Sequence, residues 1–215
     1  AAYIKFTNGD DFALTPKTSY CGYGFYHGFM ETLLSSGADI AEARRFCSYV
    51  NQKLSGQVKD ALNHCYHGMG HGIVDGSDKK SWGDAELLIG PGLELCEQVG
   101  ETGTERDRCA SGVFNALAVA YTNSDFGLAL DPKNPYGICS KRGQPYFKKT
   151  CYEEMNTAVL HAMNLNFDKA AKLAEAIPED EYAAFALQGL AVFASSFLED
   201  RGPKSYQKIV AACLP

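Results

Sequence analysis

The sharpest chemical feature of the sequence is a pair of histidines, His67 and His71, which lie four residues apart in the segment Cys65-Tyr-His-Gly-Met-Gly-His-Gly72. Residues at positions i and i+4 share one face of an α-helix. Two imidazoles in this arrangement can ligate a single metal ion. The pair therefore indicates a metal site, provided that the segment is helical and a third ligand lies nearby.

An internal repeat identifies where that third ligand could come from. Four cysteines, each followed by a similar segment of small and aromatic residues, are spaced by 44, 44 and 42 residues: Cys21, Cys65, Cys109 and Cys151. A degenerate fifth copy begins at Ala186, which replaces the cysteine. In a stacked helical array, equivalent faces of consecutive repeats lie side by side. Side chains at equivalent repeat positions are therefore expected to be neighbours.

Alignment of the repeats places His27 of the first repeat at the position of His71 in the second. We therefore predict a metal centre with His27, His67 and His71 as ligands. Three imidazoles with one open coordination position suit a divalent metal ion, zinc above all, and copper or iron uses the same type of ligand. The alternative is a polar groove in which histidines and tyrosines bond to one another within the stack.

Two carboxylates, Glu31 and Asp75, lie one helical turn beyond His27 and His71. Either could be a fourth ligand, a hydrogen-bond partner of an imidazole, or a general base, and we take both as the candidate catalytic residues. The sequence contains no Gly-x-x-x-x-Gly-Lys-Ser/Thr, Gly-x-Ser-x-Gly or His-Glu-x-x-His motif. Nucleotide binding, serine hydrolase chemistry and standard metalloprotease chemistry are therefore unsupported.

The eight cysteines, none in Cys-x-x-Cys spacing, favour disulfides in an oxidising compartment over buried reduced thiols. The fourth repeat lacks its closing cysteine and the fifth lacks its opening one, which suggests that these two positions normally bond to each other. The predicted pairs are Cys47–Cys65, Cys96–Cys109 and Cys139–Cys151. Cys21 and Cys213 remain, either bonded to each other or not. The localisation expected from this pattern is secreted or periplasmic.

Apolar residues recur at three- and four-residue intervals, as in Phe25, Phe29 and Leu33, and predict helices. The expected helices include 38–50, 167–177, 183–198 and 204–213, with Asp39 and Asp168 as N-caps. Glycine and proline predict loops at 76–83, 90–92 and 131–144.

The expected fold class is all-α, a repeat array of about five disulfide-stapled αα-hairpins, either an α-solenoid or an α/α-toroid. An N-terminal extended arm of residues 1–20 precedes the repeat domain of residues 21–215. This architecture resembles that of cysteine-rich Sel1-like repeat proteins, but their repeat is shorter and their cysteines sit differently. The resemblance implies nothing about function.

Glycines four residues apart recur on one face of the predicted helices. These pairs are Gly24/Gly28, Gly68/Gly72 and Gly112/Ala116, where alanine replaces the second glycine. Because glycine disfavours helices, we expect it to serve close packing of helix backbones, or else the approach of a ligand.

The chain has a net charge of -6 and scattered basic residues, which argue against nucleic acid as a partner. Its longest apolar stretch is interrupted by polar residues, so no transmembrane segment is expected. The function that these patterns predict is an extracytoplasmic metal-binding helical-repeat protein, with a metalloenzyme as one form of it. The alternative is a non-catalytic scaffold that binds a peptide or glycan. A small molecule or a peptide is the expected ligand, and the patterns do not determine the oligomeric state.

Overall fold

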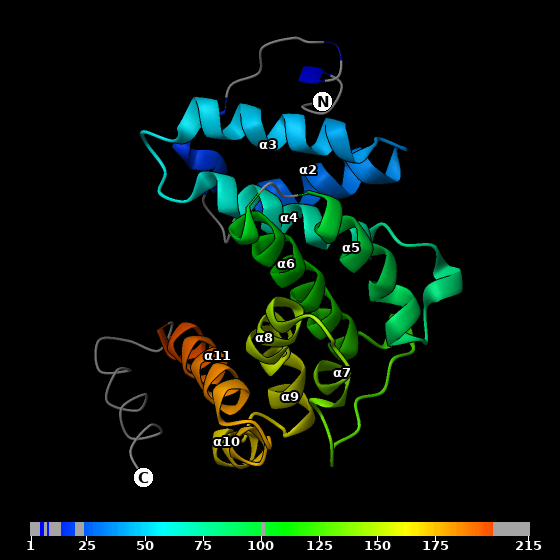
Figure 1. The fold of residues 1–215 in the computed structure, drawn as a ribbon, viewed down its shortest axis with the longest axis vertical. Helices are drawn as coiled ribbons and strands as arrows, with labels where there is room; N and C mark the ends of the chain where they lie inside the picture. Colours follow the sequence, from blue (N-terminus) through cyan, green and yellow to red (C-terminus); the bar gives the residue numbers. More distant parts are fainter. Residues whose placement is uncertain (1–4, 7, 9–13, 20–23, 100–101, 200–215) are drawn as a thin grey trace. The chain divides into compact units, whose positions relative to one another are not determined.

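The computed structural model describes residues 5, 6, 8, 14–19, 24–99 and 102–199, and in these ranges it contains helices and no strand (Figure 1). The all-α prediction is confirmed. The chain forms two compact units, Ala1–Leu117 and Ala118–Pro215, which we call unit 1 and unit 2. No helix in the described part of the chain is both long enough and apolar enough to cross a bilayer.

Unit 1 is built around a central helix. Helix α4 packs against α2, α3 and α5 and also contacts α6. The elements of unit 1 are the 3-10 helices η1 (Pro16–Ser19) and η2 (Lys79–Ser81) and the helices α2 (Gly24–Ser35), α3 (Ile40–Leu54), α4 (Ala61–Asp75), α5 (Ala85–Val99) and α6 (Gly103–Thr122), of which α6 continues past Leu117. Of the predicted N-terminal arm, the described residues include the helical turn η1.

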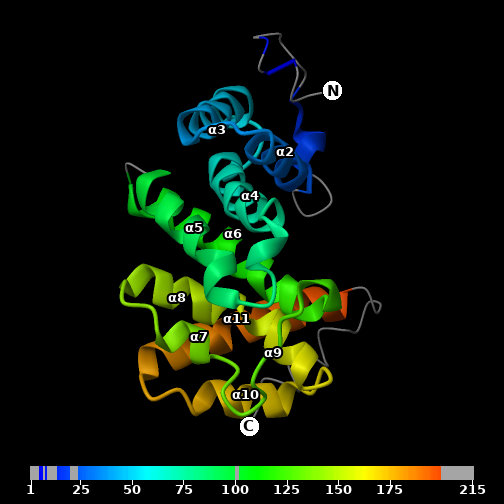
Figure 2. The ribbon, with the colours of Figure 1, turned by 90° about the vertical axis from the view of Figure 1, so that its right-hand side faces the viewer.

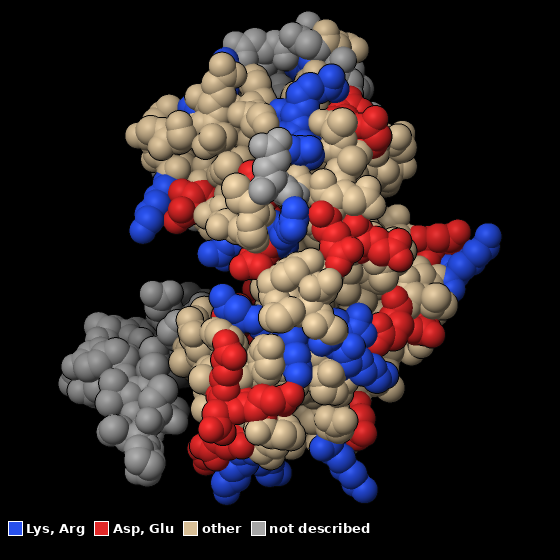
Figure 3. Space-filling model, viewed as in Figure 1, with Lys and Arg blue, Asp and Glu red and all other residues tan. Residues whose placement is uncertain are grey.

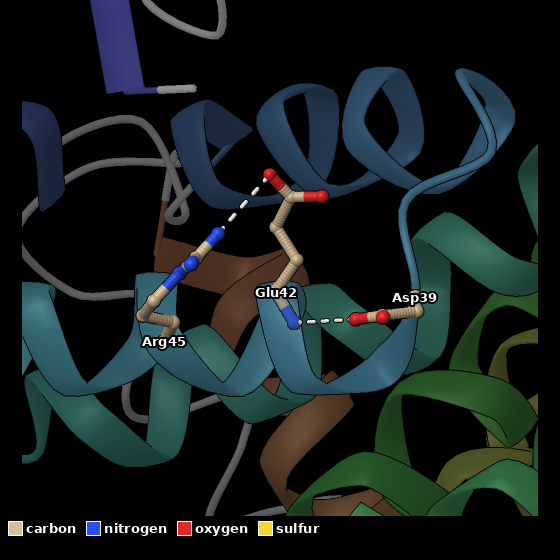
Figure 4. A network of polar contacts seen from close by, with 3 residues as sticks. All are labelled: Asp39, Glu42 and Arg45. Carbon is tan, nitrogen blue, oxygen red and sulfur yellow. Dashed lines mark hydrogen bonds and ion pairs between the residues drawn. The ribbon is translucent and has the colours of Figure 1, made fainter. Parts of the chain in front are cut away.

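Helix α3 illustrates how closely the local sequence specifies its element. Asp39 is the N-cap, as predicted, and its carboxylate accepts a hydrogen bond from the backbone N–H of Glu42 at 2.8 Å. The Glu42 side chain in turn pairs with Arg45 (Figure 4). The apolar face that begins at Ala43 and Phe46 is fully buried.

Glycines let α4 approach its neighbours closely. A Cβ at Gly72 would lie 2.6 Å from the backbone nitrogen of Glu31 on α2, and Gly68 is in similarly tight contact with α2. The prediction of close packing is thus confirmed for these two residues. It is wrong for Gly24 and Gly28, because a Cβ at either position would meet no described atom within 4 Å. Both lie on the exposed side of α2.

Unit 2 consists of short helices packed on one long one. Helix α11 packs against α8, α9 and α10, and α7 packs against α8 (Figures 1 and 2). The elements are η3 (Ser124–Phe126), α7 (Gly137–Ser140), α8 (Pro145–Glu154), α9 (Asn156–Ala162), α10 (Phe167–Glu175) and α11 (Asp180–Glu199). The predicted helix at 183–198 is α11, whereas 204–213 lies outside the described residues.

The three predicted disulfides are confirmed: Cys47–Cys65, Cys96–Cys109 and Cys139–Cys151. Their Cα atoms are 5.3 to 5.5 Å apart, within the range that a disulfide spans. The first two lie in unit 1 and the third in unit 2. Cys21 and Cys213 lie outside the described residues.

Two further local predictions are wrong, and the expected loop at 131–144 contains the short helix α7. The expected loop at 90–92 is the middle of α5, where Gly92 is buried against Val113 and Pro91 is on the exposed side. Burial of one helix face here outweighs the helix-breaking tendency of proline, and water can reach the carbonyl that proline leaves without a donor. Asp168 is not an N-cap, because α10 begins one residue earlier and Asn166 caps it.

Candidate metal centre

The predicted site lies entirely in unit 1, on two helices that pack side by side, α2 and α4 (Figures 1 and 2). Helix α2 carries His27, and α4 carries His67 and His71. The glycine contacts between these helices leave little space between their backbones, so the side chains that flank the contact are brought together.

The three imidazoles form one cluster. The ring centroids of His27 and His71 are 4.2 Å apart, and the two rings are stacked with an interplanar angle of 16°. The centroid of His67 lies 5.6 Å from that of His27 and 5.0 Å from that of His71. One nitrogen from each ring can be chosen so that all three lie within 4.8 Å of one another. The sequence-based expectation that these histidines converge is therefore met.

Helix α6 holds two of the rings from the other side of α4. His67 Nδ1 lies 3.0 Å from Ser111 Oγ, and His71 Nε2 lies 2.9 Å from Asn115 Oδ1. Gly112, between these two residues, lies against the backbone carbonyl of His67 with no room for a Cβ. Both hydrogen bonds join residues 44 apart, which is the spacing of the repeat.

Burial favours the neutral, metal-binding form of His27 and His67. It is the main reason that the pKa of His27 is lowered to about 4, and the neighbouring His71 lowers it further. The pKa of His67 lies well below the usual value, also because of burial first and the nearby imidazoles second. A metal ion binds the unprotonated nitrogen of an imidazole, so these two rings can act as ligands without first losing a proton near neutral pH.

The cluster contains a buried nitrogen that lacks a partner. His27 Nε2 is shielded from solvent and has no hydrogen-bond partner among the described groups. Buried polar atoms are normally paired, because an unpaired one loses its bond to water and gains nothing in return. A metal ion between the rings would supply the missing partner.

The two candidate carboxylates differ in their relation to the cluster. Asp75 Oδ2 lies 3.5 Å from His71 Nδ1, and its side chain is 37% exposed. Glu31 is exposed on α2, one turn beyond His27. Among the described residues, the three histidines form the group whose ligand atoms all lie within 4.8 Å of one another, and neither carboxylate meets this distance to all three.

Sequence reasoning assigned no role to Ser111 and Asn115, although both occupy the histidine-bearing positions of the repeat in their own helix. Small polar residues at these positions carried too weak a signal when taken alone. His161 occupies, in the fourth repeat, the position that Glu31 and Asp75 occupy in the first two; it is exposed on α9 in unit 2 and is not part of the cluster. His64 is partly buried, and burial followed by the charge of Arg108 lowers its pKa.

Charged side chains of both signs are interspersed on the face of the molecule shown in Figure 3.

Comparison of the chain with protein-family models, with curated proteins and with solved structures gave no significant match. The function is therefore inferred from the geometry and chemistry of the site.

Proposed function

We propose that this chain is an extracytoplasmic metal-binding protein in which His27, His67 and His71 ligate one divalent transition-metal ion, zinc in the first instance. The observation that carries the proposal is the convergence of three imidazoles from two helices, with ligand nitrogens within 4.8 Å of one another. Neighbouring ligand atoms around a tetrahedral zinc ion are about 3.3 Å apart. Small rotations of the three rings would close the difference.

The choice of metal follows from the donor set. Neutral imidazoles suit zinc, copper and iron, whereas calcium and magnesium prefer oxygen ligands. Three protein nitrogens leave a coordination position for a further ligand or a substrate, as catalytic zinc sites do. In such a centre Asp75 or Glu31 would be the general base.

The extracytoplasmic assignment is supported by the three disulfides, because such bonds persist mainly in oxidising compartments. We further propose that the fold is an array of repeated αα-hairpins. This is supported by the 44-residue spacing of the contacts between α4 and α6 and by the equivalent positions of His27 and His71 in the sequence.

The test is the metal content of protein purified without a histidine tag and then incubated with zinc and dialysed. Elemental analysis should find about one zinc ion per chain in the wild type and none above background in the double variant His67→Ala/His71→Ala. The matched control is His64→Ala/His161→Ala, which also removes two histidines but leaves the cluster intact, and it should bind as the wild type does.

Equal zinc content in the wild type and in the His67→Ala/His71→Ala variant would end the proposal. Circular dichroism of each variant shows whether the helices are retained, so that loss of metal can be separated from loss of fold. The same measurement on protein that has not been incubated with zinc identifies any metal that the chain acquires during expression. The alternative function, a scaffold that binds a peptide or glycan, predicts no stoichiometric metal in any of these samples.

A further inference from the structure

The hydrogen bond between His71 and Asn115 determines which nitrogen of His71 can bind a metal. Asn115 Oδ1 lies 2.9 Å from His71 Nε2. An amide oxygen only accepts hydrogen bonds, so Nε2 must carry the proton and donate it. In the neutral ring the lone pair is then on Nδ1, the nitrogen that points toward Asp75.

The distance between His71 Nδ1 and Asp75 Oδ2 fits this assignment. It is 3.5 Å, which is longer than the roughly 2.7 to 2.9 Å of a charge-assisted hydrogen bond between such groups. It is close to the spacing of about 3.3 Å between two neighbouring ligand atoms around a tetrahedral zinc ion. Two atoms that both present lone pairs at this separation repel each other unless a proton or a metal ion lies between them.

His67 contacts α6 through the other ring nitrogen, Nδ1. Its Nδ1 bonds to Ser111 Oγ at 3.0 Å, so Nε2 is the nitrogen available to a metal ion. In unit 1, α6 therefore contacts both rings of α4 on the nitrogens that do not face the metal. His27 contributes Nε2, which is buried and has no hydrogen-bond partner in the described part of the chain.

We infer that the centre has a fourth protein ligand, the carboxylate of Asp75, and that Asn115 directs His71 to bind through Nδ1 while His67 and His27 bind through Nε2. In the structure this carboxylate lies beside His71 but not within 4.8 Å of all three ligand nitrogens, so metal binding would draw its partly exposed side chain toward them. This inference rests on the proposed metal site. It specifies a centre of three nitrogens and one carboxylate oxygen, in which Ser111 and Asn115 are positioning residues. Because Asp75 is part of the coordination in this arrangement, Glu31 becomes the remaining candidate for a general base.

The opposite arrangement defines what would overturn the inference. In many metal sites a carboxylate accepts a hydrogen bond from the nitrogen of histidine that does not bind the metal. Applied here, His71 would bind through Nε2 after breaking its bond to Asn115, and its Nδ1–H would donate to Asp75. The two arrangements protonate opposite nitrogens of the same ring.

Nitrogen-15 NMR of the zinc-loaded protein separates these arrangements, because metal-bound and protonated ring nitrogens have different chemical shifts. The expected result is a protonated Nε2 and a zinc-bound Nδ1 for His71, with the reverse for His67. Zinc bound through Nε2 of His71 would overturn the inference while leaving the proposed function intact. Wild-type protein that takes up no zinc would overturn both.

Two variants test the roles of the individual residues by zinc titration. Asp75→Asn should weaken zinc binding about 10- to 100-fold, whereas Asp168→Asn, which removes an exposed carboxylate on α10, should leave affinity unchanged within about twofold. Asn115→Leu should also weaken binding, and Asn115→Asp, which keeps an acceptor oxygen, should retain the Nδ1-bound pattern in the NMR spectrum. Unchanged affinity in Asp75→Asn would exclude the carboxylate as a ligand.

Discussion

Unit 1 and unit 2 share one type of helix contact, in which a glycine lies against a backbone carbonyl, but the side chains around that contact differ. Gly112 in α6 lies against the backbone carbonyl of His67, and Gly189 in α11 lies against the backbone carbonyl of Glu153 in α8. Both glycines occupy the third position after the start of their repeat, and both carbonyls belong to the second position of the preceding repeat. The backbone contact is therefore common to the two units, and the chemistry depends on the side chains around it.

The polar groups beside the contact are satisfied in unit 2 but not in unit 1. In unit 2, Asn156 donates to the carbonyls of Tyr152 and Glu153 and accepts a hydrogen bond from Tyr136 at 2.6 Å. In unit 1, His27 Nε2 is buried without a partner among the residues that the structure describes. A buried network whose donors and acceptors are paired stabilises a core, whereas an unpaired nitrogen beside two other imidazoles has capacity to bind a ligand.

The largest effect should come from adding a methyl group at the shared contact. Gly112→Ala and Gly189→Ala should each lower the free energy of unfolding by about 3 kcal/mol or more. This is the upper end of the cost of overpacking, because in both cases the new Cβ would meet backbone atoms, which cannot rotate away. Urea-induced unfolding followed by circular dichroism measures the effect.

Gly28→Ala is the matched control for both glycine variants. It lies on the exposed side of α2 with open space around it, so alanine should stabilise the helix by up to about 1 kcal/mol. If Gly189→Ala were neutral while Gly112→Ala was destabilising, the contact would not be equivalent in the two units, and the helix packing as well as the chemistry would differ between them.

The disulfides provide a second comparison, in which the units should behave alike. Cys96–Cys109 and Cys139–Cys151 close loops with sequence separations of 13 and 12 residues. In the chain-entropy model, replacing either pair by alanines should cost about 3 kcal/mol, with a difference of only about 0.1 kcal/mol between them. A difference well above 1 kcal/mol in urea unfolding would show that native packing around one of the bonds, rather than loop closure, sets its contribution.

Much of this structure could be predicted from the sequence, because the relevant signals are periodic. The pairing of the cysteines followed from two positions lost together, Ala176 and Ala186, and the convergence of His27 with His71 followed from the repeat spacing. Such predictions need only the register of one helix against the next. They do not require knowledge of the exact crossing geometry.

What the sequence could not provide depends on side-chain direction and on packing. To predict the hydrogen bonds of Ser111 and Asn115, one must know which ring nitrogen of each histidine faces α6. The spacing of residues in the sequence does not contain that information. Pro91 indicated a loop because proline strongly disfavours the interior of a helix, but burial of the apolar face of α5 outweighs that preference. Gly28 shares its spacing with Gly72 yet faces open space, since the repeat register does not tell which glycines have a neighbour.

The smallest predicted loss of stability, at acid pH, should be greater in unit 1 than in unit 2. Burial lowers the pKa of His27 to about 4 and that of His67 well below its usual value, whereas an unfolded histidine titrates near 6.5. Between these values the unfolded chain binds more protons than the folded chain. The stability that the neutral rings confer is therefore fully present above about pH 6.5 and is lost as the pH falls toward about 4.

Hydrogen exchange at about pH 6.5 and about pH 4.5, corrected for intrinsic rates, should show protection falling in α2 and α4 by on the order of 1 to 2 kcal/mol. The range is reduced from the full pKa shift because His27 is only half-buried and solvent screens its charge. The single histidine of unit 2, His161, is exposed on α9, so α9 should lose less protection. The double variant His27→Gln/His67→Gln should remove this difference in acid sensitivity between the units. If α2 and α4 kept their acid sensitivity in that variant, carboxylates rather than the buried imidazoles would be its source.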